Sequence, residues 1–161
     1  MLIKDHKWKT NKWLIVLQVF LHWTWGLTQT LLGLFVFIAT SWWCKHYWNH
    51  GNVFTVIKLK KPWGGFSLGF FTFGDYAHED KDGKLIESEL SEHEYGHTLQ
   101  SILLGPVDLF VIEIPSMMWY WFFDGYRKKH SVSYYDLYCE RWADKWGGVP
   151  YRGFKTKPYE L

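Results

Sequence analysis

Two histidines and a glutamate in the stretch SEHEYGHTLQ, residues 91–100, have the types and spacing needed for metal-dependent hydrolysis. His93 and His97 are four residues apart, so on a helix their rings lie on one face, one turn from each other. Two imidazoles placed in this way can bind one tetrahedral Zn²⁺ ion. Glu94 follows the first histidine directly, where its carboxylate can reach a zinc-bound water and act as a general base. Gly96 has no side chain and would allow close packing behind the metal.

A zinc site of this type needs a third protein ligand, and a pair of acidic residues further along the chain can supply it. In YCERWADKWGG, Glu140 and Asp144 are four residues apart on a segment with a helical pattern. Glu140 could provide the third ligand oxygen, and Asp144 could accept a hydrogen bond from the ring N–H of a ligating histidine. Two such acids on their own more often mark the surface of an amphipathic helix, but the histidine pair upstream favours the metal interpretation.

HExxH followed by ExxxD resembles the motif pair of the gluzincin group of zinc metallopeptidases. The resemblance implies zinc ligands at His93, His97 and Glu140. It also implies that Glu94 is the general base and that Asp144 supports His93. The expected reaction is hydrolysis of a bond in a peptide or protein substrate by a metal-activated water, without a covalent intermediate.

Further groups could assist this reaction. By residue type, the candidates for stabilising the oxyanion are His130, Tyr126, Tyr134 and Tyr135. The segment FSLGFFTF, residues 66–73, precedes the metal helix, at the place where zincins tend to carry an edge strand that pairs with extended substrate.

The same residues allow other interpretations. A non-catalytic interaction protein could use a structural metal, or no metal, to brace a membrane-docked fold. A structural zinc would need a fourth protein ligand, and Cys139 beside Glu140 could provide it. A hydrolase of lipids or small amides would use the same activated water. Glu94 also has a structural alternative, since Ser91 and Glu94 match a capping box.

The whole chain, residues 1–161, is predicted to form one α+β domain with a mostly helical, zincin-like part at 53–150. The predicted elements of that part are a helix from Ser88 or Ser91 to about Leu104, a second helix over 134–146, and a β-hairpin of strands 53–60 and 66–73. Gly105-Pro106 would end the first helix. An N-terminal apolar helix or helical hairpin precedes this part.

Residues 13–43 form an apolar segment without Asp, Glu, Lys or Arg, longer than the roughly 20 residues that a helix needs to cross a bilayer. We expect it to associate with a membrane, either as one long helix or as a helical hairpin that bends near Gly26. The alternative is a buried helix in a soluble core. An aromatic content of 21% also favours a boundary between lipid and water. Lysines in the polar segment 1–12 favour a cytoplasmic N-terminus; they are Lys4, Lys7, Lys9 and Lys12.

A second apolar stretch, residues 107–123, is interrupted by Asp108, Glu113 and Pro115. A full crossing here would put His97 and Glu140 on opposite sides of a bilayer. An intact site therefore requires a re-entrant or surface-lying path, or a site at membrane depth walled by protein. Residues 64–150 also resemble a family of small uncharacterised bacterial membrane-associated proteins, which usually carry an aromatic residue in place of Asp108 and a small one in place of Glu113. The resemblance implies a location at the bacterial inner membrane, and we expect the site to face the cytoplasm.

Composition argues against two other classes of protein. The formal net charge is +2, and no block of like charge predicts a surface for nucleic acid. Two cysteines, Cys44 and Cys139, do not make a disulfide framework, and we expect free thiols. The expected cofactor is Zn²⁺, and the expected partners are a peptide or protein substrate and membrane lipid.

Overall fold

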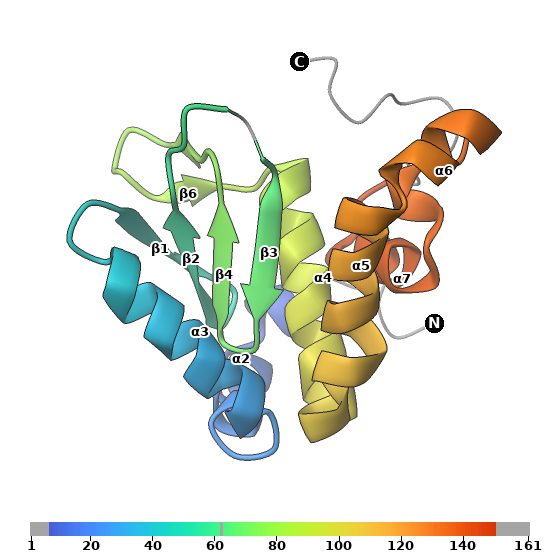
Figure 1. Ribbon diagram of the computed structural model, residues 1–161. Helices are drawn as coiled ribbons and strands as arrows, with labels where there is room; N and C mark the ends of the chain where they lie inside the picture. Colours follow the sequence, from blue (N-terminus) through green and yellow to red (C-terminus); the bar gives the residue numbers. More distant parts are fainter. Residues whose placement is uncertain (1–6, 62, 151–161) are drawn as a thin grey trace.

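The computed structural model describes residues 7–61 and 63–150, which form an α+β fold (Figure 1). Its α-helices are α1 Lys7–Thr10, α2 Lys12–His22, α3 Leu27–Thr40, α4 Glu89–Leu104, α5 Ile114–Phe122, α6 Asp124–His130 and α7 Tyr138–Gly147. Between them lie the 3₁₀ segments η1 Gly105–Val107 and η3 Tyr134–Asp136 and the π-helical turn η2 Leu109–Glu113. The strands are β1 Lys45–Asn49, β2 Asn52–Val56, β3 Gly65–Leu68, β4 Phe71–Gly74, β5 His78–Glu79 and β6 Leu85–Ile86. The predicted α+β class is confirmed.

The main sheet differs from the predicted hairpin of segments 53–60 and 66–73. Its strand order is β1-β2-β4-β3, with β2 and β4 parallel and the other two pairs antiparallel. Val53 pairs with Phe71 in the parallel ladder, and segment 66–73 is itself a hairpin whose strands β3 and β4 pair with each other. The prediction was wrong because a parallel pair is joined by a distant connection that local turn residues do not reveal.

Strand β1 was not predicted, because polar residues interrupt the apolar pattern of KHYWN. It pairs with β2 across the tight turn His50-Gly51, in which both residues have positive φ. Turns of this kind match the natural twist of antiparallel strands. The sheet therefore has four strands, and β3 is one of its edges.

Helices cover both faces of this sheet (Figure 1). On one face, Phe71 packs in a cluster with Leu34 and Phe37 of α3. On the other face, Phe54 packs in a cluster with Leu90 of α4. This arrangement puts α4 against β3, so the edge strand runs beside the helix that carries the two histidines.

The N-terminal apolar segment is not one long helix. It folds as α2 and α3, whose directions differ by 88° across residues 23–26, so the bend lies where it was expected, near Gly26. Within the described ranges, no single helix has both the length and the apolar composition of a membrane span. Two bent pairs of helices have this length and composition only when their two members are taken together. They are α2 with α3, and Glu89–Val107 with Leu109–Phe122, which are bent by 117°.

The polar segment before α2 is part of the folded structure, as far as it is described. Lys9 is buried, and its Nζ donates a hydrogen bond to the carbonyl oxygen of Gly147 at 2.9 Å. It also forms an ion pair with Glu92 of α4. Lys9 therefore links α1 to α4 and α7, whereas Lys4 lies outside the described residues.

The helices that carry the two motifs, α4 and α7, pack directly against each other. A Cβ at Gly96 would overlap the carbonyl oxygen of Ala143, and a Cβ at Gly147 would overlap that of Glu92. The close packing expected at Gly96 is therefore present. It brings α7 within side-chain reach of the histidines on α4.

Helix α7 begins later than predicted. Ser133 and Asp136 form a capping box on the 3₁₀ turn η3, and Leu137 is extended, with φ −63° and ψ 141°. The extended residue separates η3 from α7, which starts at Tyr138. The predicted helix over 134–146 is therefore wrong in its first turn, because local side-chain bonds to the backbone compete with helix propagation.

Replacing Gly96 by Ala is expected to destabilise the protein by about 1–3 kcal/mol, the usual cost of an added methylene group in a packed interior. The new Cβ would push on the backbone of α7, so zinc affinity should fall as well. Thermal unfolding and zinc titration would measure the two effects. Gly125→Ala, at a site with open space in α6, is the matched control. Unchanged stability and zinc affinity in Gly96→Ala would contradict the packing argument.

Candidate metal centre

Helix α4 is capped by two serines. Ser91 N–H donates to Ser88 Oγ at 3.2 Å, and Ser88 N–H donates to Ser91 Oγ at 2.9 Å. This reciprocal pair is the capping box, so the capping role considered for Glu94 is wrong. Glu94 lies in the second turn of the helix, is 2% exposed, and lines a cavity together with His93 and His97.

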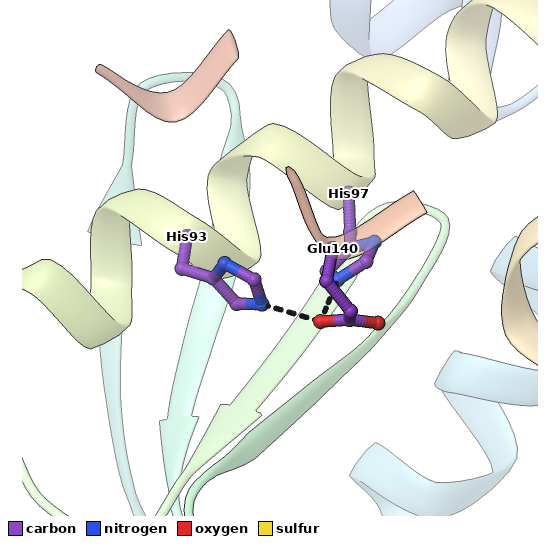
Figure 2. Close-up of side chains that lie close together, drawn as sticks. All are labelled: His93, His97 and Glu140. Atoms are coloured by element: carbon purple, nitrogen blue, oxygen red, sulfur yellow. Dashed lines mark hydrogen bonds and ion pairs between the residues drawn. The ribbon is translucent and has the colours of Figure 1, made fainter. Parts of the chain in front are cut away.

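Three side chains from α4 and α7 direct donor atoms towards one point (Figure 2). Glu140 Oε2 lies 3.1 Å from His93 Nε2 and 3.5 Å from His97 Nε2. Ligand atoms about 2.0–2.2 Å from a tetrahedral zinc ion are roughly 3.3–3.6 Å from each other. Both measured separations lie close to this range. The three residues therefore fit a single zinc ion with small side-chain adjustments.

The second ring nitrogen of each histidine also has a partner. His93 Nδ1 lies 2.7 Å from Asp144 Oδ1, and His97 Nδ1 lies 2.7 Å from Gln100 Oε1. Acceptors at both Nδ1 atoms favour the tautomers that leave Nε2 for a metal. Gln100 in turn donates through Nε2 to the carbonyl oxygen of Cys139 at 2.8 Å. Asp144 has the position its expected role requires, and Gln100 is its unexpected counterpart for His97.

Burial and charge together set the protonation of this group when no metal is bound. Burial alone would lower the pKa of His97, but the charge and hydrogen bond of Glu140, together with the charges of Glu94 and Glu113, outweigh it and raise that pKa to about 10. Burial would raise the pKa of Glu140, yet the imidazoles hold it well below its ordinary value. Paired in this way, His97 and Glu140 favour the imidazolium and carboxylate forms over the neutral ones.

Zinc binding at neutral pH is expected to release protons, because ligating imidazoles must be neutral. The pKa of His97, and in the same direction that of His93, lies above its ordinary value in the metal-free protein. Zinc affinity should therefore weaken as the pH falls and keep rising as the pH increases above neutrality. Calorimetric titration in buffers of different ionisation enthalpy would count the protons. Zinc binding without proton release at pH 7 would contradict this description of the site.

A cavity of about 120 Å³ is lined by His93, Glu94 and His97, whereas Glu140 is not among the residues that line it. Residues from α4, β3, η2, α5 and η3 line it. Glu94 sits against the first residue of β3, where a Cβ on Gly65 would overlap the Glu94 carboxylate. The glycine at the edge strand thus makes the room that this carboxylate occupies.

The four candidates for oxyanion stabilisation divide into two pairs. Tyr134 and Tyr135 line the cavity, and the Tyr134 hydroxyl lies 2.8 Å from Ser116 Oγ. Burial raises the pKa of Tyr134 well above its ordinary value, so its hydroxyl keeps its proton and can donate. Tyr126 and His130 are exposed on α6, where their ring centroids are 4.4 Å apart. The structure does not bring these two residues to the cavity, because α6 leads away from α4 (Figure 1).

Several residues near the site were not predicted as members of it. Ser116 and Tyr120 of α5 line the cavity, and so does Glu113, the last residue of the π-helical turn η2. Turns of this kind recur at functional sites. The sequence contained a signal for two of the missed residues. Glu113 is an acidic residue inside an apolar stretch, and such residues often have a functional role. Gln100 lies three positions after His97, on the same face of the helix.

Neither cysteine completes the donor group. Both are free thiols, as expected. In the part of the chain that the structure describes, Cys139 is not one of the converging donors, and its Sγ lies 3.7 Å from Glu140 Oε1. Burial raises the pKa of Cys139, which opposes the thiolate that a zinc ligand needs.

A second group of donors is formed by His50, Glu87 and Glu92. His50 Nε2 lies 2.8 Å from a Glu87 carboxylate oxygen, and Lys9 forms an ion pair with Glu92. The lysine supplies the positive charge that these carboxylates need. This group therefore fits an ion-pair network between α1, α4 and the β1–β2 turn better than it fits a metal site.

The assignment of a function to this chain rests on the chemistry of the site, since fold alone does not determine function. The site combines two imidazoles and one carboxylate, an acceptor behind each imidazole, and a second carboxylate at the adjoining cavity. Comparison with protein-family models, with curated proteins and with solved structures found no match to the chain.

Proposed function

We propose that the protein is a membrane-associated zinc metallopeptidase in which Glu94 is the general base. The observation that carries the proposal is the convergence of His93 Nε2, His97 Nε2 and Glu140 Oε2, of which the two histidines line a cavity. Buried charged groups are rarely tolerated unless they are paired or bind a metal. The order of the motifs, HExxH before ExxxD, adds the resemblance to gluzincins as further support.

The side chains have separate tasks in such a reaction. A zinc ion held by the three ligands would lower the pKa of a bound water towards neutrality. Glu94, next to the ligands, would take the proton of the attacking water and deliver it to the leaving amine. Asp144 and Gln100 would hold the imidazoles in the ligating orientation. Tyr134 is the best-placed donor for the developing oxyanion, because it is protonated and lines the cavity.

The edge strand offers a way to bind substrate. Strand β3 ends the sheet order β1-β2-β4-β3, so one side of it has no strand partner in that sheet. Its residues Gly65, Phe66 and Ser67 line the cavity next to Glu94. An extended peptide could add to this edge through main-chain hydrogen bonds, which would place a peptide carbonyl near the metal ligands.

A non-catalytic role for the metal is the second candidate. A structural zinc is normally closed by four protein ligands, whereas three donors converge in the described part of this chain. The cavity lined by the two histidines also favours an open coordination position over a closed one. No observation favours a lipid or small-amide substrate over a peptide.

The proposal can be tested with purified, zinc-loaded protein and a library of peptides from a digested proteome. We expect cleavage of a subset of peptides, detected by mass spectrometry as new termini. A zinc chelator should stop the cleavage, and added zinc should restore it. Full zinc occupancy without any cleavage, in detergent and in reconstituted membranes alike, would favour the non-catalytic role instead.

A further inference from the structure

Two helix corners lie together at one end of the molecule (Figure 1). The first corner, residues 23–26, joins α2 to α3, and the second corner, residues 105–108, joins α4 to η2. They touch each other: a Cβ on Gly105 would overlap the indole of Trp25, and Gln29 Nε2 donates a hydrogen bond to the carbonyl oxygen of Gly105. The two bent helix pairs therefore share one apex.

The surface around this apex is apolar and carries no exposed charge. Residues 13–43 contain no Asp, Glu, Lys or Arg, and in residues 98–112 the one charged residue, Asp108, is fully buried. The exposed apolar side chains nearest the corners are Trp23, Trp25, Leu27, Leu103, Val107 and Phe110. Large continuous apolar surfaces are rare on monomeric soluble proteins and mark a contact with lipid or protein.

Two buried polar residues of the apolar segment bond to backbone carbonyls at the corners, whereas Thr24 and Thr28 are exposed. Gln29 and Thr30 are fully buried. Gln29 bonds to Gly105, and Thr30 Oγ1 donates to the carbonyl oxygen of His22 at 2.9 Å. Non-helical backbone is tolerated at membrane depth only where protein covers and bonds it. The bonds from Gln29 and Thr30 supply such cover for the carbonyls of Gly105 and His22.

Aromatic residues mark the far ends of the apolar helices. Trp13 at the start of α2 and Trp42 after α3 are each 81% exposed, and Phe122 at the end of α5 is 73% exposed. Tryptophan is enriched where a membrane meets water. Charged residues lie next to these aromatic residues in the sequence: Lys12 precedes Trp13, Lys45 comes two residues after Trp43, and Asp124 follows the end of α5. Apart from the buried Asp108, charged residues are thus found at the far ends of α2, α3 and α5 and not at the apex, whereas exposed aromatic side chains lie at both.

From this distribution of charge we infer that both corners enter a lipid bilayer from the same side, as a re-entrant wedge that does not cross it. Helix α3 has 14 residues and is about 21 Å long, shorter than the roughly 30 Å hydrocarbon core. The bends of 88° and 117° then turn each of the two helix pairs back towards the side of the membrane from which it entered. The loops β2–β3 and β5–β6, which carry Lys58, Lys60, Lys61, Lys81 and Lys84, lie at the opposite end of the molecule and stay in water (Figure 1).

The wedge explains how His97 and Glu140 can lie on the same side of a membrane although an apolar segment separates them in the sequence. His97 on α4 and Glu140 on α7 are separated in sequence by the second corner and by α5, yet their side chains meet. A crossing would separate them, whereas a chain that enters and returns keeps both on one side. The inference rests on the membrane association in the proposed function but depends neither on zinc nor on catalysis, so the labelling pattern can fail while the peptidase activity stands.

Cysteine labelling in membranes tests the wedge. The background is Cys44→Ser, with the buried Cys139 kept. Single cysteines would replace four residues at the charged ends and loops, Lys12, Lys45, Lys84 and Lys128, and two at the corners, Leu27 and Phe110. A membrane-impermeant maleimide would be added to right-side-out and to inside-out membrane vesicles from the expression host. We expect all four lysine positions to react in the same vesicle preparation, and the two corner positions to react only after detergent is added.

Several outcomes would overturn the inference. Labelling of Lys12→Cys and Lys45→Cys from opposite sides would mean that the first pair crosses the membrane. Opposite labelling of Lys84→Cys and Lys128→Cys would mean the same for the second pair. Reaction of the corner cysteines in intact vesicles, or absence of the protein from membranes, would mean that the apex faces water or a protein.

Binding to vesicles gives a second measurement that does not need a cell. Purified protein should float with vesicles of pure phosphatidylcholine, and Phe35→Lys and Phe110→Lys should reduce the floating fraction several-fold. Phe35 is 74% exposed, so its replacement leaves the core intact, as circular dichroism would verify. Lys84→Glu, in the water-facing loop, is the control and should float like the parent protein. Equal flotation of all these variants would contradict insertion of the apex.

Discussion

Replacing Glu94 by Gln is expected to lower the rate of peptide hydrolysis by at least about 10²–10⁴-fold, the usual contribution of a positioned general base. Glutamine keeps the size of the side chain beside Gly65 but cannot accept the proton of an attacking water. Because Glu94 is not one of the three converging donors, zinc should stay bound at one ion per chain. Peptide cleavage rates and metal content, measured on the same preparation, would show both effects.

The same substitution at Glu89 provides a matched control. Glu89 is exposed in the first turn of the same helix, away from the cavity, so Glu89→Gln should cleave at the rate of the parent protein. Equal activity of Glu94→Gln and the parent would remove Glu94 from the reaction. Loss of zinc from Glu94→Gln would instead make Glu94 a ligand or a support of one.

Removal of Glu140 should have the largest effect on metal binding. Glu140→Ala deletes one of three ligands, so zinc affinity should fall by more than the about 10–100-fold that loss of an outer partner costs. The loss of zinc affinity in Asp144→Asn should lie within that smaller range, because asparagine can still accept a hydrogen bond from His93 Nδ1 but lacks the charge. Competition titration with a chromophoric chelator would rank the variants.

An acid far from the site serves as the reference for these two variants. Asp82 is exposed in the β5–β6 turn, and Asp82→Asn should bind zinc like the parent protein. Full zinc affinity in Glu140→Ala would reject the third ligand, even if the histidine variants lost the metal. An effect of Asp144→Asn as large as that of Glu140→Ala would mean that Asp144 itself contacts the ion.

The sequence was most informative where the relevant geometry is local. Helix α4 ends at Leu104 as predicted, because Gly105-Pro106 stops it, and helical periodicity places His93 and His97 on one face. The structure also brings the predicted third ligand, Glu140, to the histidines. That meeting was anticipated from the motif pair rather than from any contact that the sequence encodes directly.

Non-local features were not predictable in the same way. The parallel pairing of β2 with β4 joins segments whose local turn signals favour an antiparallel hairpin. The cavity position of Glu113 depends on the π-helical turn and on the 117° bend that brings η2 back over α4. The exposed position of His130 depends on the direction of α6, which residue types do not reveal. Each outcome is set by tertiary packing rather than by local pattern.

The central claim is that three side chains from two helices bind one zinc ion and leave an open position. Anomalous diffraction at the zinc absorption edge, from crystals of the zinc-loaded protein, tests it most directly. A single strong peak is expected about 2.0–2.2 Å from His93 Nε2, His97 Nε2 and Glu140 Oε2, with no fourth protein ligand. A peak bound by Cys139 Sγ, a peak at His50 and Glu87 instead, or no zinc at the histidine pair would contradict it.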